Sequence, residues 1–263
     1  MPDANATGPT TLGVQLYTLR TLERSFDDVL RVVAEAGYAA VETVGRHGLD
    51  AEAMRAALAR HGLRAVSTHL PLATLRDEVD ATAAFARAVG IEQVVIPSIP
   101  VDERPVDGDG WRRLGGRLAR LGGRYREHGL RLAFHNHDVE LTPVDGGTAL
   151  DALLADADPT DLAVQLDLAW IARAGLDPLA LLERHAPRCR SLHVKGLARR
   201  GEHAGEDGWT AVGQGTLAWD VLLPAAKRAG VQALLVEHDR PLDPVAAVRD
   251  GYAFLAPRVQ AMA

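Results

Sequence analysis

The chain contains 263 residues, of which 47% are hydrophobic and 24% are charged, a composition typical of a globular protein with a sizeable core. Its formal net charge of −6 argues against a general nucleic-acid-binding protein, because that class of protein needs a basic surface. No apolar stretch reaches the ~18 residues of a membrane span. Neither nucleic acid nor a membrane is therefore an expected partner.

The first ten residues, MPDANATGPT, are small and polar and show no signal-peptide pattern. We expect a flexible tail over residues 1–10, followed by a single domain over residues 11–263. The only cysteine of the sequence, Cys189, cannot form a disulfide within the chain, which favours a reducing compartment. Together these features predict a cytoplasmic protein.

The predicted elements begin with a short apolar strand over residues 12–17. A helix should follow in FDDVLRVVAEAG, whose apolar residues recur at helical spacing. Ser25 precedes this segment and is a suitable N-cap. Gly37 should end the helix, because glycine adopts the left-handed conformation without strain. The next strand is predicted over residues 38–44.

This unit of helix, glycine and strand recurs along the chain, and five of its helices end at Gly37, Gly62, Gly90, Gly129 and Gly230. Two further strands fit the same rhythm, with the helix DPLALLERH between them. The last helix is expected at residues 242–261. The eight predicted strands lie near residues 12–17, 38–44, 63–69, 92–97, 130–136, 162–168, 190–195 and 231–237.

Eight strand–helix units in a chain of this length predict an α/β fold, the (β/α)8 TIM barrel. The strands are continuous apolar runs, as expected of parallel strands covered by helices. A doubly wound open sheet is the alternative, but LGVQLYTLR lacks the glycine-rich phosphate-binding turn expected after its first strand. The Gly-Gln-Gly of VGQGTLAW, residues 213–215, is interpreted as a turn.

Polar residues gather where the predicted strands end, which is where a TIM barrel carries its active site. Alternation places His135 and His137 of LAFHNHDVEL on one face and Asn136 on the other. It also places Lys195 on the same face as His193, although a solvated lysine at the rim is an equal alternative. The strand-end candidates are Gln15, Tyr17, Glu42, His69, Ser98, His135, His137, Glu140, Asp167, His193, Lys195, Glu237, His238 and Asp239.

Such a cluster predicts a bound cation, because buried ionisable groups are costly unless they are paired or bind a metal. Asp167, His193, Glu237 and the group at residues 135–140 should surround one divalent ion. Carboxylates combined with one or two imidazoles favour Mn²⁺ or Mg²⁺, with Zn²⁺ and Co²⁺ as alternatives. Cys189 precedes its strand and lies toward the opposite end of the barrel, which excludes a thiolate site.

The order of these motifs, from GVQLYTLR to LLVEHD, resembles the sugar phosphate isomerase/epimerase family, the xylose isomerase-like TIM barrels. The stretch FHNHDVEL resembles the branch with a His-Asn-His-Asp-x-Glu signature on strand 5. That branch includes sugar isomerases and epimerases, and it is similar to inosose dehydratases and to enzymes acting on 3-keto-glycosides. The DNA-repair AP endonucleases share the barrel.

The resemblance implies one divalent metal held from strands 5, 6, 7 and 8. Asp167, His193 and Glu237 match three of the family's ligands. The fourth, a glutamate at the end of strand 5, is His135 in this sequence. Glu140 is the candidate replacement, with His137 as its rival, so the expected metal ligands are Glu140, Asp167, His193 and Glu237.

Such an ion would polarise the carbonyl of a sugar or keto-sugar and acidify the neighbouring C–H, giving an enediolate. Reprotonation of the enediolate gives an isomer or epimer, whereas loss of a leaving group makes the enzyme a lyase or dehydratase. The isomerase or epimerase is the first expectation and the lyase the second. A non-catalytic sugar-binding barrel or a DNA-repair relative is a third, and the acidic charge argues against repair.

Carboxylates and imidazoles near the ion should move protons, and Lys195 could stabilise developing negative charge. The partner expected is a small carbohydrate, and a homo-oligomer is left open. Trp170 could form an apolar wall against a sugar, or it could pack a helix. The catalytic candidates are Glu140, Glu237, His135, His137 and Lys195, and the substrate-binding candidates are His69, Glu42, Tyr17 and Trp170.

Overall fold

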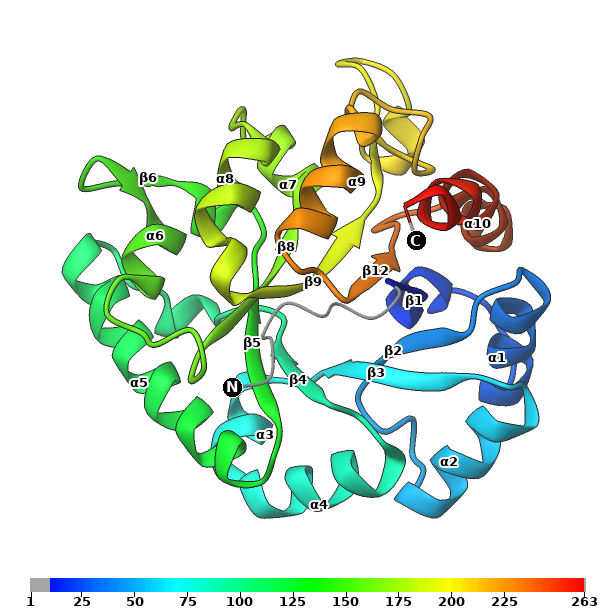
Figure 1. Ribbon diagram of the computed structural model, residues 1–263, viewed down its shortest axis with the longest axis horizontal. Helices are drawn as coiled ribbons and strands as arrows, with labels where there is room; N and C mark the ends of the chain where they lie inside the picture. Colours follow the sequence, from blue (N-terminus) through cyan, green and yellow to red (C-terminus); the bar gives the residue numbers. More distant parts are fainter. Residues whose placement is uncertain (1–9, 263) are drawn as a thin grey trace.

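A closed barrel of eight parallel strands forms the centre of the computed structural model, which describes residues 10–262, with helices around it (Figure 1). Around the barrel the strands follow the order β1-β12-β9-β8-β5-β4-β3-β2. The predicted (β/α)8 barrel is thus confirmed. The tail expected over residues 1–10 lies outside the described residues except for residue 10. The barrel strands are β1 (Thr11–Gln15), β2 (Ala40–Val44), β3 (Arg64–His69), β4 (Gln93–Ile96), β5 (Arg131–His135), β8 (Ala163–Asp167), β9 (Cys189–Val194) and β12 (Ala233–Val236).

The predicted helices form where the apolar pattern places them, and cap residues explain their ends. The short helices Leu72–Asp77, Ala149–Leu154 and Leu168–Arg173 are not anticipated by that pattern. The Ser25 hydroxyl accepts a hydrogen bond from the amide of Asp28, which begins the first helix. The five predicted helix-ending glycines all have positive φ, between 64° and 104°, the region that glycine tolerates best. The helices are α1 (Phe26–Glu35), α2 (Ala51–Arg60), α3 (Leu72–Asp77), α4 (Val79–Val89), α5 (Gly108–Glu127), α6 (Ala149–Leu154), α7 (Leu168–Arg173), α8 (Pro178–His185), α9 (Trp219–Arg228) and α10 (Pro244–Ala261).

Short elements in the loops are not anticipated by the sequence pattern. Two antiparallel pairs follow barrel strands: β6 (Pro143–Val144) with β7 (Gly147–Thr148), and β10 (Gly196–Leu197) with β11 (Trp209–Thr210). The first pair follows β5 and the second follows β9, so both decorate the carboxyl end of the barrel. Gly213–Gly215 lie in a turn before α9, as predicted.

The barrel interior is apolar at one level and polar at the next. Val95, Ala133 and Ala163 form a small buried cluster of their own, whereas Glu42 and Gln165 lie buried one step further along their strands. The ladder is irregular at this polar level. The register shifts at Glu42 in the β2–β3 pair and at Gln165 in the β8–β9 pair. Bulges of this kind re-aim side chains beside functional sites.

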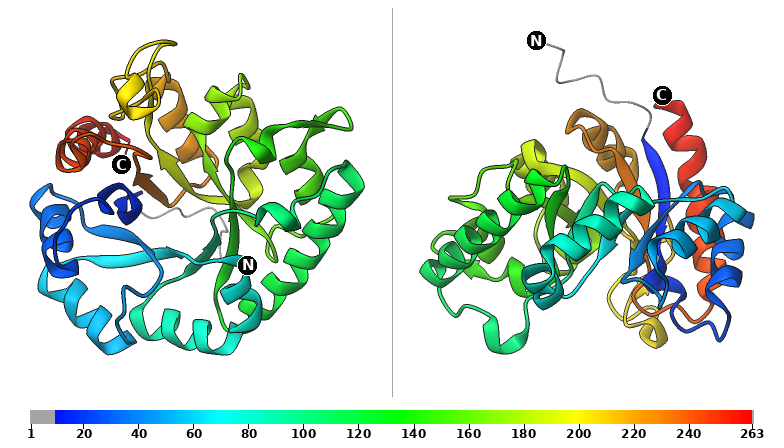
Figure 2. Two further views of the ribbon diagram at one scale, coloured as in Figure 1. Left: turned by 180° about the vertical axis from the view of Figure 1, so that it is seen from behind. Right: turned by 90° about the horizontal axis from the view of Figure 1, so that it is seen from below.

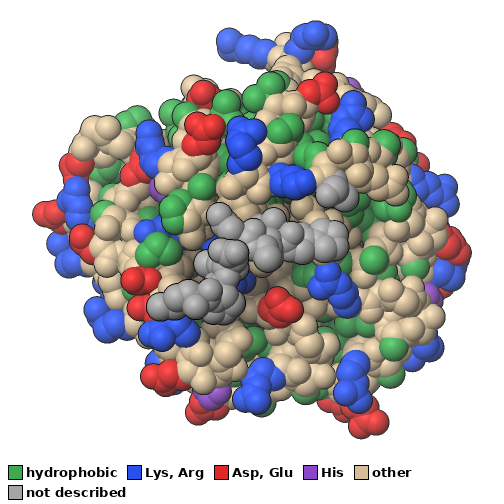
Figure 3. Space-filling view, viewed as in Figure 1, with side chains coloured by type: hydrophobic (Ala, Val, Ile, Leu, Met, Phe, Trp, Pro, Cys, Tyr) green, Lys and Arg blue, Asp and Glu red, His purple; other side chains and the backbone are tan. Residues whose placement is uncertain are grey.

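Helix α10 lies beside β1 (Figure 2). The first and last parts of the described chain are therefore joined by this packing as well as by the pairing of β1 with β12. On the face of the molecule shown in Figure 3, basic and acidic side chains are interspersed and no broad basic area is visible. Among the described residues, no helix has both the length and the apolar character needed to cross a membrane.

Helix α5 packs through glycines, which gives a test of its contact with the neighbouring backbone. A Cβ at Gly122 would overlap the carbonyl oxygen of Asp161, whereas a Cβ at Gly123 would lie 3.8 Å from Asp161 Oδ1, an ordinary van der Waals distance. Gly122→Ala should therefore lower the free energy of unfolding by about 3 kcal/mol or more. Gly123→Ala should raise it by up to about 1 kcal/mol, because alanine is the better helix former. Urea unfolding of both variants checks this pair, and equal stabilities would contradict the packing described.

Candidate metal centre

Four buried side chains from four strand ends meet in the barrel mouth. His135 ends β5, Asp167 ends β8, His193 lies on β9, and Glu237 follows β12 directly. Each offers one nitrogen or oxygen, and these four atoms all lie within 4.8 Å of one another. This is the dimension of a site in which one small ion contacts several protein ligands.

The local structure fixes the direction of the Asp167 carboxylate. Its Oδ1 accepts hydrogen bonds from the amides of Ala169 and Trp170, at 3.0 and 2.9 Å, because Asp167 is the N-cap of α7. The amide of Asp167 itself donates to Asn136 Oδ1 at 3.0 Å. Asn136 therefore fixes the position of the Asp167 backbone at the end of β8, and Oδ2 of Asp167 points toward the cluster.

The donor set fits a divalent cation. One buried atom of these side chains, His135 Nδ1, has no hydrogen-bond partner among the described residues, and the partner of Asp167 Oδ2 is the Lys195 ammonium at 2.8 Å. Buried polar atoms are rarely left without a partner, so an unpaired buried nitrogen is consistent with a site for an ion or a water molecule. Burial, and then the neighbouring His193, hold the pKa of His135 well below its usual range. His135 is thus a neutral imidazole, the form that binds metals.

Lys195 stands inside the cluster rather than at its edge. Its side chain is 0% exposed, and Nζ lies 2.8 Å from Asp167 Oδ2, 2.6 Å from Glu237 Oε2 and 2.7 Å from Asp239 Oδ2. The alternative of a solvated lysine at the rim is therefore wrong. Burial alone would lower the pKa of Lys195, but the three carboxylates, Asp167 first, raise it well above its usual value.

His193 lies between two carboxylates. Its Nδ1 is 2.9 Å from Glu237 Oε2, and its Nε2 is 2.6 Å from Glu42 Oε1. Burial alone would lower the pKa of His193, but Glu237 and Glu42 outweigh it and raise that pKa to about 10. Burial works against the charged form of Glu237, yet Lys195 and His193 hold its pKa well below the usual range. Positive charge on His193 and Lys195 offsets part of the negative charge of the neighbouring carboxylates.

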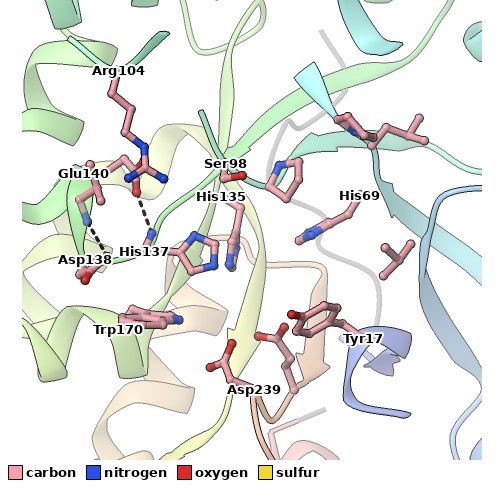
Figure 4. Close-up of a pocket in the computed structure, with 16 residues that line it drawn as sticks. Tyr17, His69, Ser98, Arg104, His135, His137, Asp138, Glu140, Trp170 and Asp239 are labelled. Atoms are coloured by element: carbon pink, nitrogen blue, oxygen red, sulfur yellow. Dashed lines mark hydrogen bonds between the residues drawn. The ribbon is translucent and has the colours of Figure 1, made fainter. Parts of the chain in front are cut away.

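A cavity of about 610 Å³ opens above the cluster, and Figure 4 shows how its labelled side chains lie. The imidazoles of His135 and His137 stand side by side, with ring centroids 4.8 Å apart. The indole of Trp170 packs edge-on against His137 and against Trp209, at 5.4 and 4.8 Å. Tyr17, 40% exposed, lies at the side of the cavity, where the Arg20 guanidinium stacks on its ring.

Glu140 lines the cavity, but its carboxylate is not among the four clustered atoms. Its Oε2 accepts a hydrogen bond from the amide of His137 at 2.9 Å. Glu140 belongs to the short 3-10 helix Val139–Leu141, which follows β5. The structure therefore brings His135, rather than Glu140, together with Asp167, His193 and Glu237.

Glu42 lies below the cavity instead of in its lining. It is fully buried, and both of its oxygens accept hydrogen bonds from protein side chains. His69, in contrast, lines the cavity, and its Nε2 donates a hydrogen bond to Gln165 Oε1 at 2.8 Å. Among the residues expected to contact substrate, His69, Tyr17 and Trp170 face the cavity and Glu42 does not.

Two residues of the site are missing from the sequence interpretation. Gln165 lies two residues before Asp167 in LAVQLDL, so strand alternation could have placed both on the inner face. Arg104 also lines the cavity, with its Nε donating to the carbonyl of Ile99 at 2.9 Å. It belongs to the long loop after β4, where no periodic pattern indicates the direction of a side chain.

Neutral buried histidines predict that metal-free protein loses stability in mild acid. Burial lowers the pKa of His137 and of His238 to about 4 each, and it holds the pKa of His135 well below its usual value. The unfolded chain binds these protons near pH 6.5 and the folded chain does not, so stability falls as the pH drops from 6.5 toward 4. Each proton that only the unfolded chain binds lowers the free energy of unfolding by about 1.4 kcal/mol per pH unit over this range. Asp239, whose pKa burial raises to about 6, opposes this slope in part.

At the alkaline side the sign reverses, because His193 with a pKa of about 10 contributes stability that is lost as the pH rises above 6.5. Stability of the metal-free protein should therefore peak near pH 6.5. Urea unfolding in the presence of chelator at several pH values measures this. In His238→Asn, the free energy of unfolding should fall less steeply as the pH drops below 6.5. A stability that rises steadily below pH 6 would contradict the buried neutral histidines.

Comparison with known proteins places this chain in a family. The model of the xylose isomerase-like TIM barrel family matches residues 30–258. The chain therefore belongs to that family, and the resemblance of its motifs is confirmed.

The relatives with curated names include a dehydratase and a catabolism protein. An inosose dehydratase of Lacticaseibacillus casei is 24% identical over 197 residues, which span 68% of this chain and 65% of the relative's length. The rhizopine catabolism protein MocC of Rhizobium meliloti is 27% identical over 248 residues, 80% of this chain and 73% of its own. The match thus leaves about a third of the dehydratase uncovered.

Solved structures share the fold. A sugar phosphate isomerase/epimerase from Parabacteroides distasonis superposes with a TM-score of 0.79 at 20% identity, covering 97% of this chain and 98% of that one. The probable 3-DHS dehydratase AsbF from Bacillus anthracis gives 0.74 at 14% identity, covering 94% and 99%. The IOLI protein, solved with a bound zinc atom, gives 0.74 at 15% identity, covering 96% and 99%.

Proposed function

We propose that the protein is a metal-dependent dehydratase acting on a small carbohydrate that carries a ketone, a hydrogen on the neighbouring carbon and a hydroxyl, lost as water, on the carbon after that. The observation that supports this most is the cluster of His135, Asp167, His193 and Glu237 beneath a cavity of about 610 Å³. Relatives named as inosose dehydratases favour loss of water over isomerisation. An isomerase or epimerase is the second candidate, because both reactions begin with removal of the same proton.

The residues divide into those that hold the ion and those that handle protons. His135, Asp167, His193 and Glu237 would hold it, with Mn²⁺ or Mg²⁺ preferred and Zn²⁺ or Co²⁺ as alternatives. When bound, the ion would polarise the substrate carbonyl and acidify the neighbouring C–H. Glu140 takes no part in holding it, since its carboxylate is engaged by the His137 amide.

Proton transfer falls to the side chains that line the cavity. Burial, and then Lys195, keep His137 neutral with a pKa of about 4, so its imidazole can accept the proton of the C–H. Burial raises the pKa of Asp239 to about 6, so near neutral pH part of the population carries a proton for a departing hydroxyl. Burial also raises the pKa of Glu140, the second proton donor in reach of the cavity.

Binding contacts come from the remaining walls of the cavity. The indole of Trp170 offers an apolar face, and His69 and Tyr17 stand at the opposite side of the cavity (Figure 4). Lys195, with Nζ 2.7 Å from Asp239, holds that carboxylate at the cavity and supplies positive charge behind it. These contacts suit a polyhydroxylated ring with one apolar side.

Product analysis in D₂O tests the proposal. The Mn²⁺-loaded protein would be incubated with inososes, 3-keto-glycosides and ketoses, with and without phosphate, and the products analysed by mass spectrometry and NMR. A dehydratase gives a product lighter by one water. Deuterium incorporation without loss of water would transfer the assignment to an isomerase or epimerase, and neither change with any substrate would favour a sugar-binding barrel.

A further inference from the structure

The Glu42 carboxylate is a fully buried acceptor with no part in the cavity lining. Its Oε1 lies 2.6 Å from His193 Nε2 and 2.7 Å from Gln15 Nε2. Its Oε2 lies 2.5 Å from Ser67 Oγ and 2.7 Å from Gln165 Nε2. A carboxylate so surrounded is ionised and serves only as an acceptor, because amide NH₂ groups can only donate to it.

This arrangement fixes the proton of the His193 ring. Since Glu42 Oε1 accepts, Nε2 of His193 must carry a hydrogen and donate it. The other ring nitrogen, Nδ1, faces Glu237 Oε2 at 2.9 Å and Asp167 Oδ2 at 4.0 Å. Nδ1 is thus the nitrogen on the side of the candidate ligands, and Nε2 is on the far side.

Neighbouring side chains prevent Glu42 from turning. Gln165 points its Oε1 at His69 Nε2, at 2.8 Å, so its NH₂ group must face Glu42 and Ser191, at 2.7 and 3.1 Å. The register shifts in the β2–β3 and β8–β9 pairs set Glu42 opposite Ser67 and Gln165 opposite Ser191. The cage is therefore built into the barrel ladder.

We propose that Glu42 is a positioning residue that holds His193 in the one tautomer whose Nδ1 lone pair points at the metal. This rests on the metal site of the proposed function and goes beyond it, because Glu42 touches neither ion nor substrate. A carboxylate behind a ligating imidazole fixes the ring orientation and raises the basicity of the ligand, and its loss typically costs 10–100-fold in metal affinity.

The experiment compares a variant that changes the carboxylate itself with a variant that removes one of its donors. Glu42→Gln keeps the shape but loses the charge, and its NH₂ group can turn toward His193 Nε2. Ser67→Ala removes a donor to Glu42 and leaves the contact with His193 in place. Mn²⁺ affinity is measured by electron paramagnetic resonance of free Mn²⁺, and the folding of each metal-free variant by circular dichroism.

We expect Mn²⁺ to bind Glu42→Gln about 10–100-fold more weakly than wild type, with Ser67→Ala close to wild type. A folded Glu42→Gln variant with wild-type affinity would overturn the positioning role alone. A wild-type protein that binds no Mn²⁺ would overturn the proposed function and this role with it.

A second measurement covers the case in which Glu42→Gln does not fold. The ¹⁵N shifts of the imidazoles in wild-type protein loaded with Zn²⁺ report which nitrogen of His193 is metal-bound. Nδ1 bound and Nε2 protonated is the expected result. Zn²⁺ on Nε2, or a protonated Nδ1, would overturn the assignment.

Discussion

Replacing Asp167 by Asn is expected to leave the barrel folded and to remove its bound metal. Asn would keep a side-chain oxygen for the amides of Ala169 and Trp170, which Oδ1 of Asp167 now accepts. Its NH₂ group would replace Oδ2, the oxygen that faces the cluster and lies 2.8 Å from Lys195 Nζ. Divalent metal affinity should fall by more than the 10–100-fold typical of losing an outer partner, and turnover should fall by about 10³-fold or more.

Metal content after dialysis and the affinity for Mn²⁺ measure this effect. The matched control is Asp177→Asn. Asp177 caps α8 with its Oδ1, which accepts from the amide of Leu179 at 2.9 Å, and it is exposed and not a member of the cluster. The control should retain wild-type metal binding. Wild-type metal content in Asp167→Asn would remove Asp167 from the ligand set.

Lys195→Met is expected to destabilise the metal-free protein by about 3–5 kcal/mol, because removal of one partner leaves buried charge uncompensated. The Lys195 ammonium lies within 2.8 Å of carboxylate oxygens from Asp167, Glu237 and Asp239. Methionine has a similar length but no charge, so three carboxylates would share a site without their cation. Lys195 therefore acts as the resident counter-ion of the cluster when no metal is bound.

Adding Mn²⁺ should recover more stability in Lys195→Met than in wild type, since the ion no longer competes with an ammonium for the same oxygens. Urea unfolding with chelator and with Mn²⁺ measures both values. The sequence holds one other lysine, Lys227, exposed near the end of α9, and Lys227→Met is the control with little expected change. A Lys195→Met protein as stable as wild type without metal would contradict the counter-ion role.

The sequence predicts the barrel well because the signals for its elements are local. Apolar runs mark the strands, and a glycine such as Gly90, with φ of 92°, marks the left-handed turn from a helix into a strand. The β10–β11 pair after β9 escapes this reasoning, because two-residue strands have no measurable period. The same is true of the loop that carries Arg104 into the cavity.

The candidate site is predictable in outline, since carboxyl ends of barrel strands converge. Depth is not predictable, because alternation tells which face a side chain takes but not its level. Glu42 and Lys195 illustrate this limit: one lies beneath the cavity and the other is fully buried among carboxylates. The choice between His135 and Glu140 depends on the turn after β5, in which the His137 amide binds the Glu140 carboxylate.

The most direct test of the metal site is an anomalous-scattering map from crystals of the protein grown with Mn²⁺. We predict a single strong peak bounded by His135 Nδ1, Asp167 Oδ2, His193 Nδ1 and the Glu237 carboxylate, the position that the four clustered ligand atoms define. A peak held by Glu140 in place of His135, or no peak in the barrel mouth, would contradict the account.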